Sequence, residues 1–206
     1  DTLALSADDV GISGGACEDF PLKVPRGFVQ RMRPGDPHDP LLLQVLSSAQ
    51  ELADTPGYAR DPLGESGAIN PRRGIMHKYH GRVLLIVSGG CAVNCRYCFR
   101  RHFPYNENQN SRQQWHEALD YIRADSSIEE VILSGGDPLV ATDEQFQQLI
   151  EQIAAIAHVQ RLRIHSRLPV VIPARVTDAL LAAITPKDLQ TIMVIHCNHA
   201  SEIDES

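Results

Sequence analysis

Val83-Leu-Leu-Ile-Val-Ser-Gly-Gly-Cys-Ala-Val-Asn-Cys-Arg-Tyr-Cys98 is the stretch of sequence that decides the fold class. Its first five residues are a short apolar run, which indicates a buried strand. A glycine-containing loop follows at once and carries three cysteines in a C-x3-C-x2-C arrangement. In α/β proteins the loops after the strands carry the ligand site, so this stretch predicts a strand that delivers a site to one sheet edge.

Three later apolar runs repeat this arrangement. They predict strands at Val131–Leu133, Arg161–Ile164 and Thr191–Ile195, and their first residues are 30 positions apart. This spacing suits βα units, in which a helix returns the chain to the start of the next strand.

Capping patterns indicate a helix between each pair of strands. Ser111 with Gln114, and Thr142 with Gln145, have the spacing of capping boxes ahead of apolar residues at helical intervals. Thr177 is positioned to cap a third helix. We therefore expect a parallel sheet, open or closed into a barrel.

Polar clusters lie where each strand should end. They are Ser88-Gly-Gly90 with the cysteines, Ser134-Gly-Gly-Asp137, His165-Ser-Arg167 and His196-Cys-Asn-His199. The carboxyl ends of parallel strands meet at one edge, so the sequence predicts a single site there.

Residues 1–80 differ from the rest of the chain, because proline and glycine interrupt them repeatedly. Their strongest helix signal begins at Asp39, and apolar residues recur at helical spacing as far as Leu52. We expect residues 1–80 to be a mainly helical and irregular wrapping segment, and residues 81–206 to be the core.

Composition excludes several classes of protein. The net charge of −7 disfavours a basic nucleic-acid surface, and no apolar run approaches the ~20 residues that cross a membrane. The five cysteines are an odd number and three of them cluster, which does not suit a disulfide framework. Clustered thiols indicate metal ligands in a reducing compartment, and we expect the cytoplasm.

Two metal centres compete for the cysteine triple. A structural zinc site needs a fourth protein ligand, for which His102, Cys197 or His199 is conceivable. Three thiolates also suit a four-iron cluster that keeps one iron open to a small molecule, and the position after a strand favours this interpretation.

The Cys91–Cys98 motif, followed by Ser134-Gly-Gly-Asp-Pro-Leu139, resembles the radical S-adenosylmethionine (SAM) superfamily. Further motifs resemble the lysine 2,3-aminomutases, closest to the branch that makes β-lysine for modification of translation elongation factor P (EF-P). These motifs are Tyr79-His-Gly-Arg-Val-Leu-Leu-Ile86, Cys98-Phe-Arg-Arg-His102, Arg163-Ile-His-Ser-Arg-Leu-Pro-Val-Val171 and His196-Cys-Asn-His199. The resemblance implies part of a (βα)6-type barrel and an isomerase that moves the lysine amino group from C2 to C3.

The resemblance also implies the cofactors and their ligands. A [4Fe–4S] cluster would sit on the three cysteines, with SAM on its open iron and pyridoxal phosphate (PLP) holding the substrate. Two glycines let a backbone approach a ligand closely, although a tight βα turn needs them equally. The residues expected around SAM are Tyr97, Gly135, Gly136, Asp137 and His196, with Arg167 serving SAM or PLP. Tyr97 and His196 have the alternative of being ordinary buried polar side chains.

Fewer residues match the substrate and PLP positions. Arg100 matches the arginine that pairs with the substrate carboxylate, although the adjoining Arg101 can be the matched residue instead and a surface arginine is the alternative role. Lys78 matches a cation for the PLP phosphate, although a surface lysine is an equal alternative. The lysine that binds PLP and the carboxylates for the substrate ε-ammonium have no match in this chain, and Lys187 does not fit. We expect about two βα units to be missing at the C-terminal end, and the PLP site to be incomplete.

The implied partners are L-lysine and an electron donor such as flavodoxin or ferredoxin, without nucleic acid or membrane; the sequence does not decide whether the protein is a homo-oligomer. Two alternatives stay open: a degradative lysine or glutamate 2,3-aminomutase, and a noncatalytic iron–sulfur or zinc-binding module.

Overall fold

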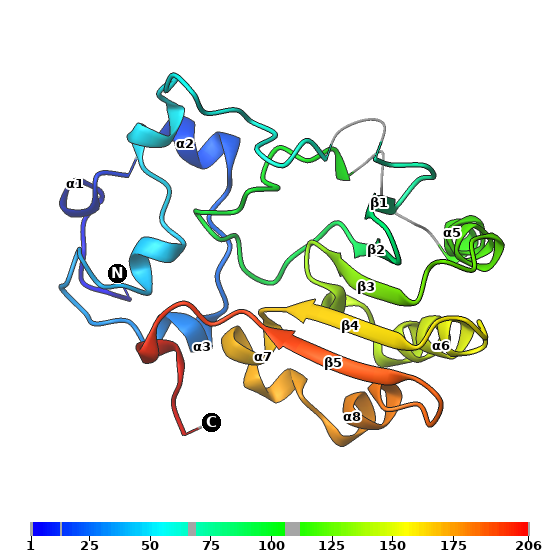
Figure 1. The fold of residues 1–206 in the computed structure, drawn as a ribbon. Coiled ribbons are helices and arrows are strands. Elements are labelled where there is room, and N and C mark those ends of the chain that lie inside the picture. The colour runs from blue at the N-terminus through cyan, green and yellow to red at the C-terminus, as the bar shows by residue number, and fades with distance from the viewer. Residues whose placement is uncertain (1, 13, 66–68, 106–111, 206) are drawn as a thin grey trace.

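A five-stranded sheet organises the computed structural model, which describes residues 2–12, 14–65, 69–105 and 112–205 (Figure 1). The strands are β1 (Ile75–Tyr79), β2 (Arg82–Ser88), β3 (Glu130–Gly135), β4 (Arg161–Ser166) and β5 (Gln190–Ile195). They lie in the sheet in chain order, β1 antiparallel to β2 and the other pairs parallel. The predicted α/β class and all four predicted strands are confirmed, in an open sheet consistent with part of a barrel.

Strand β1 was missed by the sequence prediction. It forms a tight hairpin with β2, in which Tyr79 pairs with Arg82 and Gly81 adopts a φ of +79°. Glycine accepts such a backbone conformation at little cost, so Gly81 is the signal that marks the turn. The sheet therefore begins within residues 1–80.

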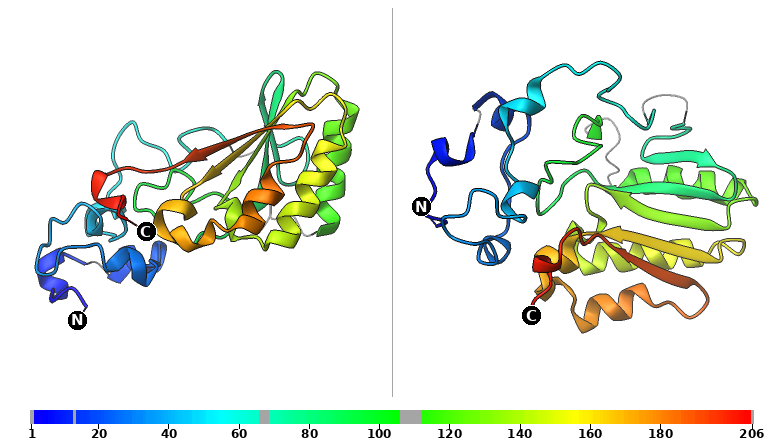
Figure 2. Two further views of the ribbon diagram at one scale, coloured as in Figure 1. Left: turned by 90° about the horizontal axis from the view of Figure 1, so that it is seen from below. Right: turned by 60° about the vertical axis from the view of Figure 1, so that its left-hand side comes forward.

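A helix follows each of β2, β3 and β4, and the three helices cover one face of the sheet (Figure 2). They are α5 (Arg112–Ala124), α6 (Asp143–Ala154) and α8 (Asp178–Ile184). The capping box of Thr142 and Gln145 is confirmed, and the Thr177 hydroxyl accepts a hydrogen bond from the Leu180 amide at 3.1 Å. The Ser111 part of the other predicted box lies outside the described residues.

The main core lies between the sheet and these helices. Alternate residues of the strands face the helices and are fully buried: Val83, Leu85, Val131, Leu133, Leu162 and Ile164. Because side chains alternate along a strand, Arg163 and His165 point to the open face. There Arg163 forms an ion pair with Glu130, with 2.7 Å between Nη2 and Oε1.

The N-terminal segment lies beyond the C-terminal ends of the parallel strands (Figures 1 and 2). Its elements are short: α1 (Ala7–Val10), α2 (Gly14–Asp19), α3 (Arg26–Val29), and 3-10 turns η1 (Leu42–Gln44) and η2 (Ala49–Leu52). A second apolar cluster joins it to the core, and Phe28, Leu41 and Val45 in this cluster pack with Val93 and Val171. The segment thus buries itself against the loops that follow β2 and β4.

The continuous helix predicted from Asp39 to Leu52 was wrong. The Asp39 carboxylate does cap a turn, by accepting from the Leu41 and Leu42 amides at 2.9 Å each. The turn ends at Gln44, whose carbonyl accepts from the Arg96 amide at 2.7 Å instead of continuing the helix. A tertiary contact therefore overrides a local helix signal.

Short turns follow the later strands. They are η3 (Pro138–Val140) after β3, α7 (Leu168–Val171) and η4 (Pro173–Arg175) after β4, and η5 (Ala200–Glu202) after β5. In the described parts of the chain, no helix has the length and apolar character needed to cross a membrane.

Candidate functional site

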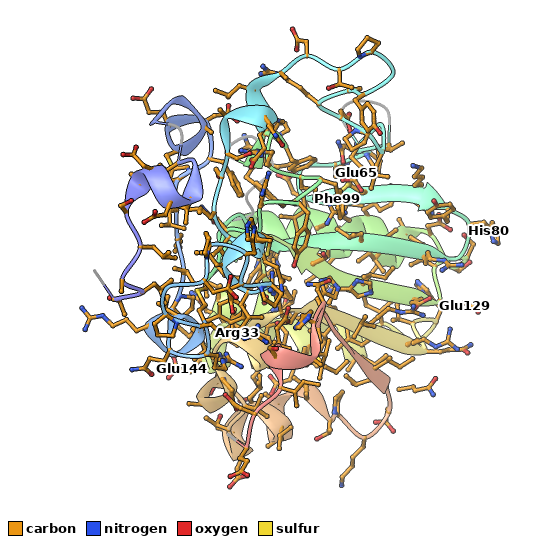
Figure 3. The ribbon with its side chains drawn as sticks, turned by 90° about the vertical axis from the view of Figure 1, so that its left-hand side faces the viewer. Arg33, Glu65, His80, Phe99, Glu129 and Glu144 are labelled. Atoms are coloured by element: carbon orange, nitrogen blue, oxygen red, sulfur yellow. The ribbon has the colours of Figure 1, made fainter. Side chains whose placement is uncertain are left out.

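The loops after β2, β3, β4 and β5 meet at one edge of the sheet, as the sequence predicts. The Gly136 amide donates to the Ser88 carbonyl at 2.7 Å, and the His196 amide donates to the Ser166 carbonyl at 3.0 Å. In Figure 3, Glu65 and Phe99 lie near each other on the side of this edge, whereas His80 and Glu129 lie at the opposite ends of the strands.

The cysteine loop is held by the N-terminal segment. The Asn94 amide donates to the Lys23 carbonyl at 2.9 Å, and the Arg96 amide donates to the Gln44 carbonyl at 2.7 Å. Arg96 also forms an ion pair with Glu51, with 2.6 Å between Nε and Oε1. The predicted wrapping segment therefore fixes the conformation of the loop that carries the three cysteines.

Cys91, Cys95 and Cys98 are free thiols of intermediate exposure. Burial raises the pKa of Cys91 to about 12, with further contributions from Asp137, Cys98 and Cys95. Burial also raises the pKa of Cys98. The thiols are thus close enough to influence one another, and a metal that binds Cys91 and Cys98 must displace their protons.

The donor set suits an iron–sulfur cluster better than a single ion. One zinc ion needs its ligands gathered about a single centre at ~2.3 Å from sulfur. Among the residues that the structure describes, no three His, Cys, Asp or Glu side chains gather in this way. A four-iron cluster binds each thiolate to a different iron, and three thiolates on one loop fit that requirement.

Gly135 and Gly136 are required by contacts within the protein. Gly135 has a φ of +118°, and a Cβ atom there would lie 2.4 Å from the Ser88 carbonyl oxygen. A Cβ atom at Gly136 would lie 2.3 Å from the Gly90 carbonyl oxygen. The loops after β2 and β3 are therefore in direct backbone contact, and this contact explains why glycine is needed at both positions. The sequence analysis had also offered the close approach of a ligand as the reason. A SAM contact at these glycines stays a prediction.

The Asp137 carboxylate is buried and used within the protein. Its oxygens accept four hydrogen bonds, from Ser166 Oγ at 2.7 Å, Arg167 N at 2.8 Å, Leu139 N at 3.0 Å and Leu168 N at 3.1 Å. A carboxylate has about four acceptor positions, so this one has none left for a ligand ammonium. The Asp137 carboxylate thereby ties the loop after β3 to the end of β4. A SAM contact at Asp137, which would use its backbone carbonyl, stays a prediction.

Tyr97 and Arg167 lie together. Arg167 Nη1 donates to Tyr97 Oη at 2.5 Å and to Cys95 Sγ at 2.8 Å, while its Nη2 donates to Gln44 Oε1 at 2.6 Å. Asn198 Nδ2 also donates to Tyr97 Oη, and about half of Tyr97 is exposed. The sequence analysis left the partner of Arg167 open; in the structure its guanidinium group binds Cys95, Tyr97 and Gln44.

Arg100 is buried against a carboxylate that the sequence prediction missed. Its Nε donates to Glu65 Oε2 at 2.6 Å and its Nη2 donates to Glu65 Oε1 at 2.8 Å. Its Nη1 donates to Ser134 Oγ at 3.3 Å. In the described part of the chain, two of the five guanidinium N–H groups remain without a partner. The substrate-carboxylate role of Arg100 stays a prediction, and it would have to use those two donors.

His196 lies beside His165. Their rings meet edge to face, with 5.6 Å between centroids. Burial lowers the pKa of His165, and the neighbouring His196 lowers it further. His165 therefore favours its neutral form on the open face of the sheet, where the sequence analysis had assigned it no role.

The lysines of the chain do not complete a PLP site. Lys78 lies on β1, where its Nζ donates to the Leu63 carbonyl at 2.8 Å. Lys187 precedes β5, at the end of the sheet opposite the cysteine loop. The remaining lysine, Lys23, is in the N-terminal segment. Lys23 lies beside the cysteine loop, where its charge opposes the rise in the pKa of Cys91. None of the three lysines lies in a motif that matches the position of a covalent PLP linkage.

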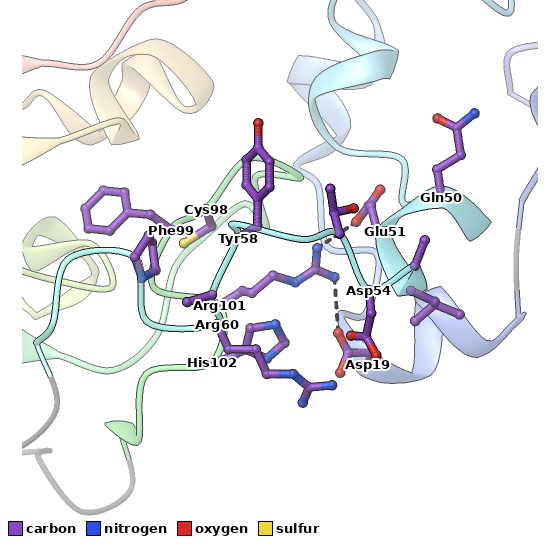
Figure 4. Close-up of a pocket in the computed structure, with 15 residues that line it drawn as sticks. Asp19, Gln50, Glu51, Asp54, Tyr58, Arg60, Cys98, Phe99, Arg101 and His102 are labelled. Atoms are coloured by element: carbon purple, nitrogen blue, oxygen red, sulfur yellow. Dashed lines mark hydrogen bonds and ion pairs between the residues drawn. The ribbon is translucent and has the colours of Figure 1, made fainter.

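A pocket of about 580 Å³ adjoins the cysteine loop (Figure 4). Cys98, Phe99 and His102 line one side of it, and residues 50–55 and 58–60 line another. Arg101 crosses its wall and pairs with Glu51, with 2.6 Å between Nη1 and Oε2, and with Asp19. The wall of this pocket is therefore fixed by ion pairs between the cysteine loop and the N-terminal segment.

Comparison with known proteins identifies relatives of the chain. Residues 85–192 match the family model of the radical SAM superfamily. The chain is 51% identical to the L-lysine 2,3-aminomutase of Escherichia coli (strain K12) over 205 residues, which cover 99% of the chain and 59% of that relative. It is 52% identical to the corresponding Haemophilus influenzae protein over 203 residues, 98% of the chain and 60% of that relative. An L-lysine 2,3-aminomutase of Clostridium subterminale is 36% identical over 182 residues, covering 86% of the chain and 42% of that protein.

These coverages define how much of such a protein the chain represents. The chain spans about 60% of the length of the first two relatives. The match to the superfamily includes all three cysteines, the glycine loop and β4.

Proposed function

We propose, on the premise that the chain belongs to the radical SAM superfamily, that it is the cluster- and SAM-binding part of an L-lysine 2,3-aminomutase. One observation supports the proposal most: the cysteine loop lies beside the loops after β3, β4 and β5 at one edge of the sheet. This enzyme would isomerise L-lysine to β-lysine. Its similarity to proteins named L-lysine 2,3-aminomutase supports this substrate.

We propose the following roles for the residues of the site. Cys91, Cys95 and Cys98 would hold a [4Fe–4S] cluster, which when bound supplies an open iron for SAM and the electron for its reductive cleavage. The residues proposed around SAM are Tyr97, Gly135, Gly136, Asp137 and His196, with Arg167 serving SAM or PLP. The half-exposed Tyr97 ring can stack on a ligand while Arg167 and Asn198 hold its hydroxyl group.

Arg100 would bind the substrate carboxylate. Its pairing with Glu65 fixes the guanidinium plane and cancels most of its charge before a substrate arrives. The two remaining N–H groups then select an acceptor that fits this fixed orientation. Lys78 would supply a cation for the PLP phosphate. Because no lysine of the chain matches the position that binds PLP covalently, we derive no step through that cofactor.

The use of β-lysine is a further part of the proposal. The sequence motifs resemble the branch that supplies β-lysine for EF-P, and the free cysteines suit a reducing compartment such as the cytoplasm. Mass spectrometry of EF-P from cells with and without the gene tests this role. An EF-P of equal mass in both strains would favour the degradative alternative.

Labelled L-lysine tests the activity. The anaerobically reconstituted chain, and a longer protein of the relatives' length that carries it, would each be incubated with SAM, PLP and dithionite. We expect both to form 5′-deoxyadenosine and only the longer protein to form β-lysine. β-Lysine from the 206-residue chain would mean that Lys78 or Lys187 serves PLP, and no deoxyadenosine from either would favour a noncatalytic metal-binding module.

A further inference from the structure

The guanidinium group of Arg167 is buried beside a cysteine of the proposed cluster. Its side chain is only 6% exposed and lies at the end of β4. One N–H group of Nη1 points to Cys95 Sγ at 2.8 Å. The group also lies over the rings of Phe28 and Tyr97, with 5.5 and 5.7 Å to the ring centroids. A permanent positive charge is therefore buried next to a thiol.

The Glu202 carboxylate forms a buried ion pair with this guanidinium group but is not its closest neighbour. Glu202 Oε1 lies 3.4 Å from Arg167 Nη2, farther away than Cys95 Sγ lies from Nη1. Glu202 is itself occupied, because its Oε1 accepts from Gln44 Nε2 at 2.6 Å and its Oε2 accepts from the Asn198 amide at 3.3 Å. A Cys95 thiolate would be a second anionic acceptor for the guanidinium group, closer to it than Glu202 is.

Arg167 is not needed to tether these segments. Gln44 binds Glu202 directly, and Arg31 Nη1 donates to the Glu202 carbonyl at 2.6 Å. Both contacts join the N-terminal segment to the loop after β5 without the Arg167 side chain. The contact between Arg167 and the sulfur therefore calls for an explanation other than cohesion of the fold.

We propose that Arg167 raises the reduction potential of the cluster by donating a hydrogen bond to the Cys95 thiolate. The inference rests on the proposed function, since it requires a cluster on the three cysteines. Reduction by a low-potential one-electron donor adds one negative charge to the cluster and breaks no bond. A buried cation at a ligand sulfur stabilises the more negative state, and hydrogen bonds to cluster sulfurs are a known means of setting the potential.

Two variants change the local charge in opposite directions. Arg167→Gln removes the positive charge, so the reduced cluster loses its stabilisation. Glu202→Gln removes a buried negative charge while Arg167 stays in place, so the reduced cluster gains stability. Arg175→Gln is the matched control, because Arg175 binds the Leu139 carbonyl at 2.9 Å and Asp143, and no cysteine.

The measurement is the midpoint potential of the reconstituted cluster in the full chain, followed by electron paramagnetic resonance without SAM, after iron and sulfide content are determined. At the wild-type midpoint, we expect the ratio of reduced to oxidised cluster to fall about ten-fold in Arg167→Gln, which equals a shift of 59 mV for one electron. The ratio should rise in Glu202→Gln and stay within two-fold of wild type in Arg175→Gln.

The measurements distinguish a failure of the proposed function from a failure of the role of Arg167. A wild-type chain that binds no cluster would overturn the proposed function, and this inference with it. A normal cluster whose potential is unchanged in Arg167→Gln would overturn only the role of Arg167. If Arg167→Gln cannot assemble a cluster, Glu202→Gln decides the question alone, and a potential at or below wild type would refute the inference.

Discussion

Replacing Asp137 by alanine tests whether this carboxylate serves the fold or the ligand. The side chain is buried and accepts hydrogen bonds from one hydroxyl and three backbone amides. Hydrogen bonds to a charged group contribute about 1.5–3 kcal/mol each, but their contributions are not additive. Loss of the acceptor leaves several buried donors unpaired, so we expect a destabilisation of about 3–5 kcal/mol.

Thermal unfolding without SAM measures this loss. In a domain of this size 1 kcal/mol shifts the melting temperature by about 2–4 °C, so Asp137→Ala should melt roughly 10 °C lower. Asp137→Asn keeps the shape but turns an NH2 group toward backbone donors, and should also melt lower. Asp120→Ala is the control, because the Asp120 carboxylate is 73% exposed and pairs only with Arg123 in the described structure; it should change stability by less than about 0.5 kcal/mol.

An opposite pattern would refute this reasoning. If Asp137→Ala melts within about 2 °C of wild type and calorimetry shows weakened SAM binding, the carboxylate belongs to the ligand, and its four internal hydrogen bonds contribute little to the stability of the fold.

Three further predictions follow from buried groups of the site. Glu65→Ala leaves the Arg100 charge buried and unpaired, so chemical denaturation should show a loss of about 3–5 kcal/mol, and a change below 1 kcal/mol would contradict the pairing. Gly136→Ala places a Cβ 2.3 Å from the Gly90 carbonyl oxygen, so it should lower the melting temperature before any ligand is added; a melting temperature equal to that of wild type would indicate that the loops do not touch. His165 has a lowered pKa in the folded state, so the unfolded chain binds more protons near pH 6 and the protein loses stability as the pH is lowered. His165→Leu should flatten this dependence between pH 7 and pH 5, and an unchanged slope would contradict the burial of a neutral His165.

Local signals account for the parts of the fold that the sequence predicted. The strands around Val131 and Leu162 and the Thr142 cap depend on apolar runs and neighbouring residues, so a single sequence contains them. The helix from Asp39 was wrong because the Gln44 carbonyl binds a backbone amide 52 positions later in the chain.

Local sequence patterns predict the candidate site even less completely than the fold. The positions of Cys91, Cys95 and Cys98 follow from one motif on one loop. The partners of the arginines do not, because Glu65 is 35 residues from Arg100 and Gln44 is 123 residues from Arg167. No local pattern signals such pairs, and only the packing of the N-terminal segment against the strand ends brings them together. The structure also shows that Gly135 and Gly136, at the end of β3, allow backbone contact with the loop after β2.

Iron content and SAM cleavage, measured together on single cysteine variants, test the central claim most directly. After anaerobic reconstitution, the wild-type chain and Cys17→Ala should each bind about four irons and form 5′-deoxyadenosine from SAM under dithionite, because Cys17 lies outside the loop after β2. Cys91→Ala, Cys95→Ala and Cys98→Ala should lose both the cluster and the product. A Cys95→Ala protein that keeps four irons, or a Cys17→Ala protein that loses them, would contradict the assignment of the cluster to this loop.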